Sequence, residues 1–258
     1  MDEVNNEELG NKLVEQALEL WINPEIERRK QSNSLPENFK IYSVQVLINF
    51  DAPNEVRFNE EVKVILEGKL TRETVKGEKV IIDEVLENIT NVKLTEKDAN
   101  AGHFTMIFHR GFWHINFDFR YNASRCLEHS KAAKEFLVSA KLSLNRNNMR
   151  AFVDNLFSAT ELIAKAVLLM HDEVVFKTKK HSTVHERYNT FGKLGNINSQ
   201  YTKLLNKLAS LRPIARYVQK DFSLNKEEAK EMLKIANEMN KNLLKQIPEI
   251  VNTKENQE

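Results

Sequence analysis

The sequence predicts an α+β fold, with an antiparallel sheet domain in the first half and a helical bundle in the second. From about residue 41 to 119 apolar side chains recur at every second position, which is typical of half-buried strands. From residue 123 onward they recur every three to four positions, which indicates amphipathic helices. We therefore expect an α+β domain over residues 1–120, a helical bundle over residues 121–250, and a disordered polar tail at 251–258.

The chain before the sheet is predicted to be helical. Its apolar stripe over residues 5–21 consists of Leu9, Leu13, Ala17, Leu20 and Trp21. Asn23 and Pro24 then resemble a cap followed by a first-turn proline, which we expect to open a short helix over the residues PEIERRKQ.

Three stretches of the sheet region alternate in the manner of strands. The residues from Tyr42 to Phe50 and from Val62 to Leu66 each place apolar side chains on one face. A turn at Lys76 and Gly77 is expected to enter another strand, with some helix around 83–89. The third stretch, GHFTMIFHRGFWHINFDF, is predicted to be a hairpin that folds about His109 to Phe112.

The hydrophobic pattern selects one register for this hairpin, because a shift by one residue would mix apolar and polar side chains on both faces. The predicted pairs are Phe108–Trp113, Met106–Ile115 and Phe104–Phe117 on one face, and Ile107–His114, Thr105–Asn116 and His103–Asp118 on the other. The hairpin histidines 103, 109 and 114 are too dispersed for one tetrahedral metal site. We expect them to be solvated side chains on the polar face.

Five helices are predicted in the second half, at about 123–144, 148–171, 181–191, 199–221 and 225–247. Asn198 is expected to cap the fourth helix, and Pro213 to kink it because proline removes a backbone hydrogen bond.

Composition limits the classes of function. No apolar run approaches the roughly 20 residues that a membrane span needs, and the acidic N-terminus does not resemble a secretory signal. Cys126 is the single cysteine, so no disulfide can form within the chain and we expect a cytoplasmic protein. We expect the Cys126 side chain to have a packing role. With only 7 glycines there is no candidate phosphate-binding glycine loop, and no cofactor or metal is expected.

Charge is unevenly distributed along the chain. Residues 1–121 carry 15 Lys and Arg against 22 Asp and Glu, whereas residues 122–222 carry 17 against 8. The basic region indicates either an anionic partner or docking of the acidic first half on the helices, and the sequence favours neither.

The candidate site residues lie on three predicted helices. Arg212 and Arg216 are one turn apart beside Tyr217, and two guanidinium groups at that spacing repel unless an anion or a carboxylate lies between them. Glu161 and Lys165 are four residues apart, which suits either an ion pair at the rim of the bundle or a place in the same cleft as Arg212.

A basic segment precedes the third helix. It contains Lys177, Lys179, Lys180, His181, His185 and Arg187. The two histidines lack a carboxylate at metalloprotease spacing, so zinc is not expected. The segment suits contact with phosphate, or is a solvated basic loop.

The segments LFSATELIAKAVLLMH, KKHS and LASLRPIARY, in this order within a helical bundle, resemble the HEPN family over residues 123–247. The resemblance implies a domain found in toxins, antiphage systems and partners of minimal nucleotidyltransferases. In active members an arginine is followed four to six residues later by a histidine. Two protomers pair so that both motifs face one cleft, and they cleave RNA without metal.

Arg212 matches the arginine of that motif, but Tyr217 stands where the histidine could be, and no histidine follows His185. Histidine titrates near neutral pH, whereas tyrosine has a pKa near 10, so Tyr217 is a poor proton acceptor. His181 or His185 could substitute from the neighbouring helix.

Three functions therefore remain as hypotheses. The leading one is a catalytically weakened HEPN-like homodimer that binds RNA or a nucleotide-like anion through Arg216, Lys179, Lys180, His181, His185, Glu161 and Lys165. The second is a metal-independent ribonuclease of the toxin or antiphage type, with Arg212 and Tyr217 in the catalytic positions. The third is a protein-interaction module whose partner binds the N-terminal sheet domain.

Overall fold

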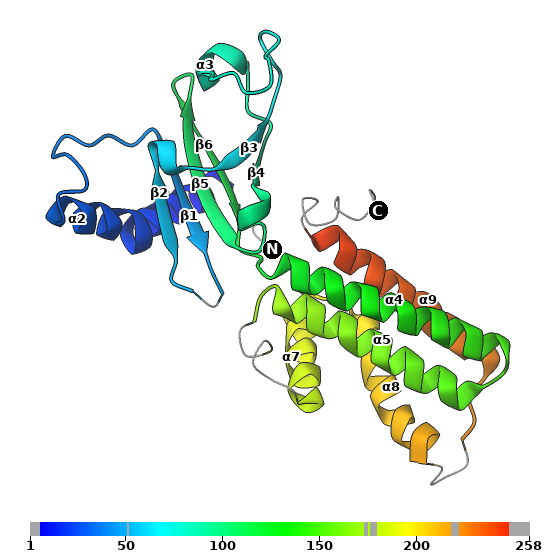
Figure 1. The fold of residues 1–258 in the computed structure, drawn as a ribbon. Coiled ribbons are helices and arrows are strands. Elements are labelled where there is room, and N and C mark those ends of the chain that lie inside the picture. The colour runs from blue at the N-terminus through cyan, green and yellow to red at the C-terminus, as the bar shows by residue number, and fades with distance from the viewer. Residues whose placement is uncertain (1–5, 51, 173–174, 176–179, 218–221, 248–258) are drawn as a thin grey trace. The chain divides into compact units, whose positions relative to one another are not determined.

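The structure is a computed structural model that describes residues 6–50, 52–172, 175, 180–217 and 222–247. The chain divides into two compact units, Met1–Phe119 and Arg120–Glu258. The first contains an antiparallel sheet and the second is a helical bundle (Figure 1). The predicted α+β fold class is confirmed.

Four strands form the main sheet in the order β2-β1-β5-β6, and all neighbours are antiparallel. Two further strands, β3 and β4, form a separate antiparallel pair. The bounds are β1 (Ser43–Ile48), β2 (Glu55–Phe58), β3 (Val64–Glu67), β4 (Asn91–Leu94), β5 (Gly102–His109) and β6 (Phe112–Asp118). The predicted turn at Lys76 and Gly77 is present, but a short helix, α3 (Ile82–Val85), follows it in place of the expected strand.

The register predicted for the hairpin is confirmed at every pair. Phe104 lies opposite Phe117, Met106 opposite Ile115, and His109 opposite Phe112. The two turn residues, Arg110 and Gly111, both have positive φ values of 48° and 87°. Two left-handed residues define the turn type whose twist matches that of the flanking strands, and glycine adopts this conformation without steric cost.

The helical N-terminal segment packs on the apolar face of this sheet, where Val44, Val46 and Phe104 are buried. Its parts are α1 (Asn6–Ala17), a π-helical turn (Leu18–Ile22) and α2 (Asn23–Gln31). The predicted short helix is present as α2, with Pro24 in its first turn, but the predicted cap at Asn23 is wrong, because Asn23 has helical backbone angles. The placement of Leu20 in the buried stripe is also wrong: Leu20 is 61% exposed and Ile22 is buried instead. The wider π turn rotates the buried face of the helix at this point.

The polar face of the sheet is also buried, which corrects the expectation of solvated histidines. His103 is 4% exposed and His109 2%. The sequence pattern did not reveal the second layer that covers this face, formed by β3, β4, α3 and a 3-10 turn at Glu96–Asp98. His103 Nδ1 lies 2.9 Å from the Thr105 hydroxyl, and His109 Nε2 lies 3.1 Å from the Leu86 carbonyl. Burial lowers the pKa of His103, so this histidine is neutral at neutral pH.

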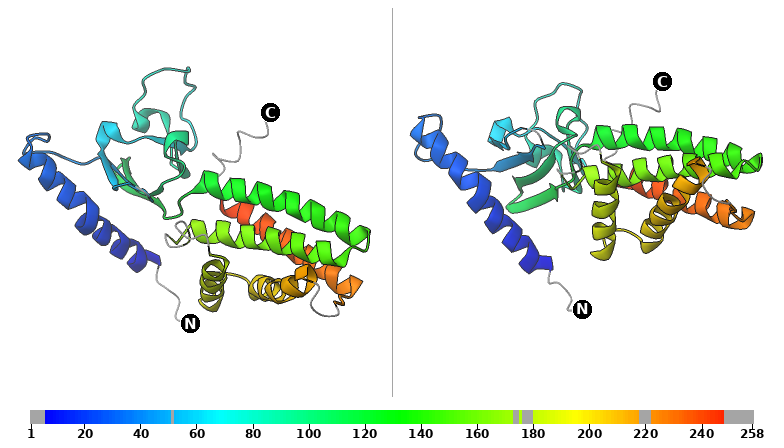
Figure 2. Two further views of the ribbon diagram at one scale, coloured as in Figure 1. Left: turned by 60° about the horizontal axis from the view of Figure 1, so that its bottom comes forward. Right: turned by 90° about the horizontal axis from the view of Figure 1, so that it is seen from below.

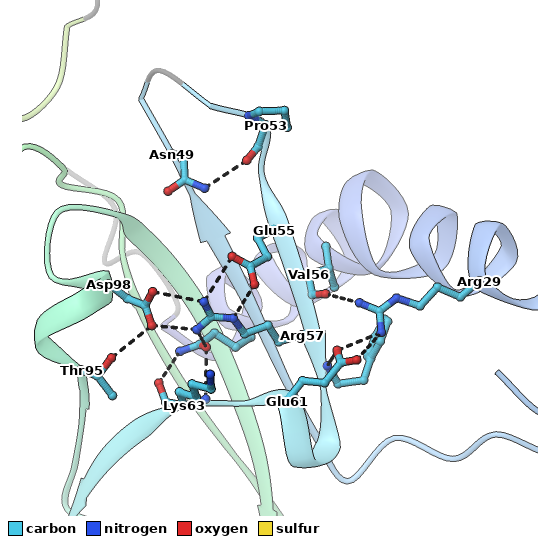
Figure 3. Close-up of polar contacts among 12 residues, drawn as sticks. Arg29, Asn49, Pro53, Glu55, Val56, Arg57, Glu61, Lys63, Thr95 and Asp98 are labelled. Atoms are coloured by element: carbon cyan, nitrogen blue, oxygen red, sulfur yellow. Dashed lines mark hydrogen bonds and ion pairs between the residues drawn. The ribbon is translucent and has the colours of Figure 1, made fainter. Parts of the chain in front are cut away.

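A buried ion pair joins the two layers (Figure 3). The guanidinium of Arg57 donates to both carboxylate oxygens of Asp98, at 2.7 and 3.1 Å, and to Glu55. On the helical side, Arg29 donates to Glu61 at 2.8 Å and to the carbonyl of Val56 at 2.7 Å. The contacts of Arg57 fix the 3-10 turn at Glu96–Asp98 to β2, and the contacts of Arg29 fix α2 to β2.

The described helices of the second unit are α4 (Ala123–Asn145), α5 (Met149–Leu169), α7 (His181–Lys193), α8 (Ser199–Tyr217) and α9 (Lys226–Gln246). The unit is built around α5, the most apolar of them, which contacts each of the others (Figure 2). The predicted cap of α8 is confirmed, since the Asn198 side chain accepts a hydrogen bond from the Gln200 amide at 2.9 Å.

Pro213 lies inside α8 as predicted. Arg150 of α5 donates to the carbonyl oxygens of Ile214 and Ala215, at 2.8 and 3.1 Å. A cation at the C-terminal end of a helix interacts favourably with the last carbonyl groups. Arg150 therefore ties the end of α8, which carries the candidate arginines, to α5.

Cys126 has the packing role that was predicted. Its side chain is buried, its thiol donates to the carbonyl of Ala166 at 3.2 Å, and burial raises its pKa to about 12. Within the described ranges, none of the helices combines the length and apolar character that crossing a membrane requires.

Candidate functional site

One face of α5 provides the floor of the candidate site. Asp154, Phe157 and Glu161 are spaced three and four residues apart, so they share this face. Helices α7 and α8 both contact α5, and their polar side chains meet it along this row. We call this group of residues, together with Arg212, Arg216, His181 and His185, the Phe157 cluster.

Arg212 is held at two points. Its Nε atom donates to Oδ1 of Asp154 at 2.8 Å, and its guanidinium carbon lies 4.4 Å from the centroid of the Phe157 ring. The second contact has the geometry of a cation–π interaction. The side chain is 24% exposed, and its two terminal nitrogens form no hydrogen bond with any residue that the structure describes. The guanidinium is thus positioned with donors still available for a ligand.

Arg216, one turn further along α8, is more open. Its Nη1 atom lies 4.0 Å from the same oxygen of Asp154, and half of its side chain is exposed. One carboxylate therefore lies between the two arginines, which is one of the two arrangements that their spacing required. Tyr217, the last residue of α8, is 64% exposed.

Glu161 and the two histidines of α7 form the other end of the cluster. Nδ1 of His181 lies 2.6 Å from Oε1 of Glu161, and Nε2 of His185 lies 3.3 Å from the same oxygen. The Nε2 atom is buried and has no well-formed hydrogen bond among the described residues. Burial alone would raise the pKa of Glu161. The two facing histidines together lower it by more than burial raises it, so the pKa lies below the ordinary value.

Phe157 connects the two ends. Its ring centroid lies 5.7 Å from that of His185, and Arg212 covers the same ring. A histidine and an arginine from different helices are therefore brought to one aromatic side chain. Two of the cluster's residues, Asp154 and Phe157, were not selected from the sequence. The available signal was their spacing from Glu161, which puts all three on one helical face.

The remaining predicted site residues lie elsewhere or outside the described residues. The Glu161–Lys165 ion pair is not formed among the described residues, because Glu161 faces the histidines. Burial lowers the pKa of His129 on α4, and the charge of Lys165 lowers it further. Lys180 is exposed just before α7. Arg187 lies 3.4 Å from Asp172. Lys177 and Lys179 lie outside the described residues.

The formal charges of the cluster depend on the protonation of its histidines. No group of three or more His, Cys, Asp or Glu side chains with metal-binding geometry occurs in the part of the chain that is described. Asp154 and Glu161 balance the formal charges of Arg212 and Arg216 when the histidines are neutral. Protonation of His181 and His185 would add positive charge to the cluster.

The fold and this cluster agree with the outcome of the comparison with protein families. The model of the HEPN domain matches residues 127–246, which is the helical bundle. The predicted resemblance of this region to the HEPN family is therefore confirmed. No curated protein and no solved structure matches the chain.

Proposed function

We propose that the C-terminal unit binds RNA or a nucleotide-like anion, and that Arg212 and Arg216 contact its phosphate groups. The support is the Phe157 cluster itself, in which Arg212 is fixed through Nε and the aromatic ring while its terminal nitrogens have no partner among the described residues. Guanidinium groups match phosphate oxygens in a two-pronged geometry. Arg212 can therefore bind a phosphate through its terminal nitrogens while its Nε atom keeps the hydrogen bond to Asp154.

The charge of the surrounding chain supports the same proposal. Residues 122–222 carry an excess of nine basic over acidic side chains. Such an excess attracts polyanions, and its effect weakens with salt. Phosphate contacts of this kind position the nucleic acid but do not read its sequence. We therefore expect binding with little sequence preference.

Catalysis is expected to be weak. Cleavage at the 2′-hydroxyl needs one group to accept its proton and one to protonate the leaving 5′-oxygen. Tyr217 occupies the motif position of the histidine and is exposed, and a phenol is a poorer proton acceptor than an imidazole at neutral pH. The resemblance to the HEPN family further implies a homodimer through the bundle. Analytical ultracentrifugation tests this, because the chain has a mass of 30.0 kDa.

The binding proposal is tested with labelled single-stranded RNA in EDTA, using fluorescence anisotropy at fixed salt. Arg212→Ala is expected to weaken binding about tenfold, which corresponds to ~1.4 kcal/mol. Arg125→Ala is the matched control, because Arg125 is an exposed arginine near the start of α4 and lies outside the cluster. Equal affinities for the parent and Arg212→Ala would contradict the proposal.

A metal-independent ribonuclease is the second candidate, and the position of His185 favours it. His185 of α7 lies against the same aromatic ring as Arg212, and it would take the role of the histidine that α8 lacks. In this reaction the 2′-oxygen attacks the phosphorus, a base accepts the 2′-hydroxyl proton, and the 5′-oxygen leaves with a proton from an acid. His185 could exchange one of these protons, with Arg212 stabilising the charged phosphorane.

The ribonuclease candidate requires cleavage in EDTA that stops when the RNA carries a 2′-deoxy substitution. His185→Ala should abolish it, whereas His129→Ala should not, because His129 lies on α4 and its Nδ1 donates to the carbonyl of Arg125 in the same helix. Cleavage that survives both His185→Ala and Arg212→Ala would come from a contaminant or another site.

Binding of a protein partner is a third candidate, favoured by the outer edge of β6. Trp113, Ile115 and Phe117 are 41 to 45% exposed on the same face. The amide of Phe108 donates to Tyr42 of the β1 side, so the Phe108–Trp113 pair exchanges no hydrogen bonds. By alternation, the backbone groups of Trp113, Ile115 and Phe117 point away from β5.

An extended segment could add to this edge as a further strand. We expect a basic segment, because residues 1–121 have seven more acidic than basic side chains. A peptide of alternating lysine and valine should bind the full chain, and its glutamate analogue should not. Ile115→Lys should weaken the lysine peptide. Equal binding of both peptides would contradict this candidate.

A further inference from the structure

The N-terminal unit contains an open cavity that the HEPN domain does not explain. Its volume is about 490 Å³, which is within the range of pockets for small molecules, roughly 300 to 1,000 Å³. One wall is the main sheet, with Ser43 and Ile107, and a second wall is β3, with Val64 and Leu66. The third wall is the segment between β3 and β4, which includes Ile82. We call this space the sheet cavity.

The segment that forms the third wall is fixed at its ends. The amide of Thr71 donates to the carbonyl of Val85 at 2.9 Å, and the amide of Glu87 donates to Lys69 at 2.8 Å. The hairpin turn holds α3 as well, since the Arg110 amide donates to Asp83 at 3.2 Å. The cavity is therefore bounded by anchored elements.

The walls of the sheet cavity are mainly apolar, and several of them face water. Leu70, Val80 and Ile82 on the third wall are 53%, 40% and 37% exposed. Filling the cavity with an apolar body would remove such surface from water, which is favourable by about 25 cal/mol for each Å². This chemistry selects a ligand with an apolar body.

Among the described residues that line the cavity, Glu60 alone has a charged side chain at neutral pH. The Tyr42 hydroxyl donates to its carboxylate, and this hydrogen bond lowers the pKa of Glu60, so the group stays ionised. Two neighbouring polar side chains are already used by the fold. Asn59 accepts from the amides of Tyr42 and Ser43, and the Ser43 hydroxyl donates to the Asn59 carbonyl.

We propose that the sheet cavity binds a small apolar molecule with one cationic amino group, whose ammonium pairs with Glu60 beside Tyr42. A ligand with the same apolar body but a carboxylate group is not expected to bind, because Glu60 and the acidic first half of the chain would repel its negative charge. A neutral ligand of the same shape would gain the apolar contacts but lose the ion pair.

A matched series of probes tests this proposal on the full chain by isothermal titration calorimetry at pH 7. The probes are 4-phenylbutylamine, 4-phenylbutan-1-ol and 4-phenylbutanoate, which share one apolar body. The amine is expected to bind at least about tenfold more tightly than the alcohol, a difference of ~1.4 kcal/mol. The carboxylate is expected to show no saturable binding.

Two variants and one control separate the ion pair from the apolar contacts. Glu60→Gln should reduce the affinity for the amine to that for the alcohol, whereas Glu37→Gln, an exposed glutamate that does not line the cavity, should not. Ile82→Trp should fill the cavity and weaken both probes, with the fold checked by circular dichroism. Unchanged amine binding in Glu60→Gln, or binding of the carboxylate as tight as that of the amine, overturns the proposal.

Discussion

Asp154 has two opposing effects on anion binding at the scale of single residues. Its negative charge repels a phosphate near Arg212, but its oxygen also fixes Nε of Arg212 at 2.8 Å. Its side chain is 39% exposed, so the ion pair itself contributes little to stability. The value of the contact is that it orients the remaining guanidinium donors.

The sign of the Asp154→Asn effect on RNA affinity separates these two roles. Simple charge removal would raise the affinity. We expect it to fall about threefold, because the amide holds Arg212 less firmly than the carboxylate does. Asp172→Asn is the control, since Asp172 pairs with Arg187 outside the cluster. The measurement is the same anisotropy titration, and a tighter complex for Asp154→Asn would show that positioning is unimportant.

The lowered pKa of Glu161 predicts that the free energy of unfolding depends on pH. Its pKa is below the ordinary value in the folded protein, so it binds protons more weakly there than in the unfolded chain. Its stabilising contribution is therefore complete above the unfolded pKa of about 4.3, and it is lost as the pH falls through the folded pKa. Urea unfolding between pH 3 and 6 should show a smaller loss for Glu161→Gln than for the parent. Parallel curves would contradict this assignment.

At the scale of elements, the strand and helix patterns could be predicted wherever one face of an element is buried and the other is not. The hairpin of β5 and β6 is such a case, because its alternating side chains allow one register. The helices α4, α5 and α9 are others, since each has an apolar stripe and defined ends.

The errors occur where tertiary contacts override the local pattern. Asn23 has the sequence of a helix cap, yet the π turn before it continues the helix, so that Asn23 is itself a helical residue. His103 and His109 alternate like solvated residues, but a second layer buries them. Asp154 was not found because nothing local indicates that α8 will place Arg212 beside it.

The ion pair between Arg57 and Asp98 is expected to hold the second layer on the sheet. Both side chains are 8% exposed. Asp98→Ala leaves a buried guanidinium without its main partner, and we expect it to destabilise the first unit by about 3 kcal/mol. The double change Arg57→Leu with Asp98→Leu should recover part of this loss in urea unfolding followed by tryptophan fluorescence. A double variant less stable than Asp98→Ala would contradict that account.

At the scale of the whole molecule, the chain joins an acidic α+β unit to a basic helical bundle that matches the HEPN domain model. The two units are therefore proposed to serve different partners. The arginines of α8 are the groups proposed to contact phosphate, and the acidic first half is proposed to suit a basic peptide.

The most direct test of the central claim is the salt dependence of RNA affinity for the parent and for Arg212→Ala with Arg216→Ala. Each phosphate contact with a single strand contributes about 0.7 to the slope of log affinity against log salt. If both arginines bind phosphate, the double variant should bind more weakly and lose about 1.4 from the slope. An unchanged slope with unchanged affinity would show that RNA, if bound at all, is held elsewhere on the protein.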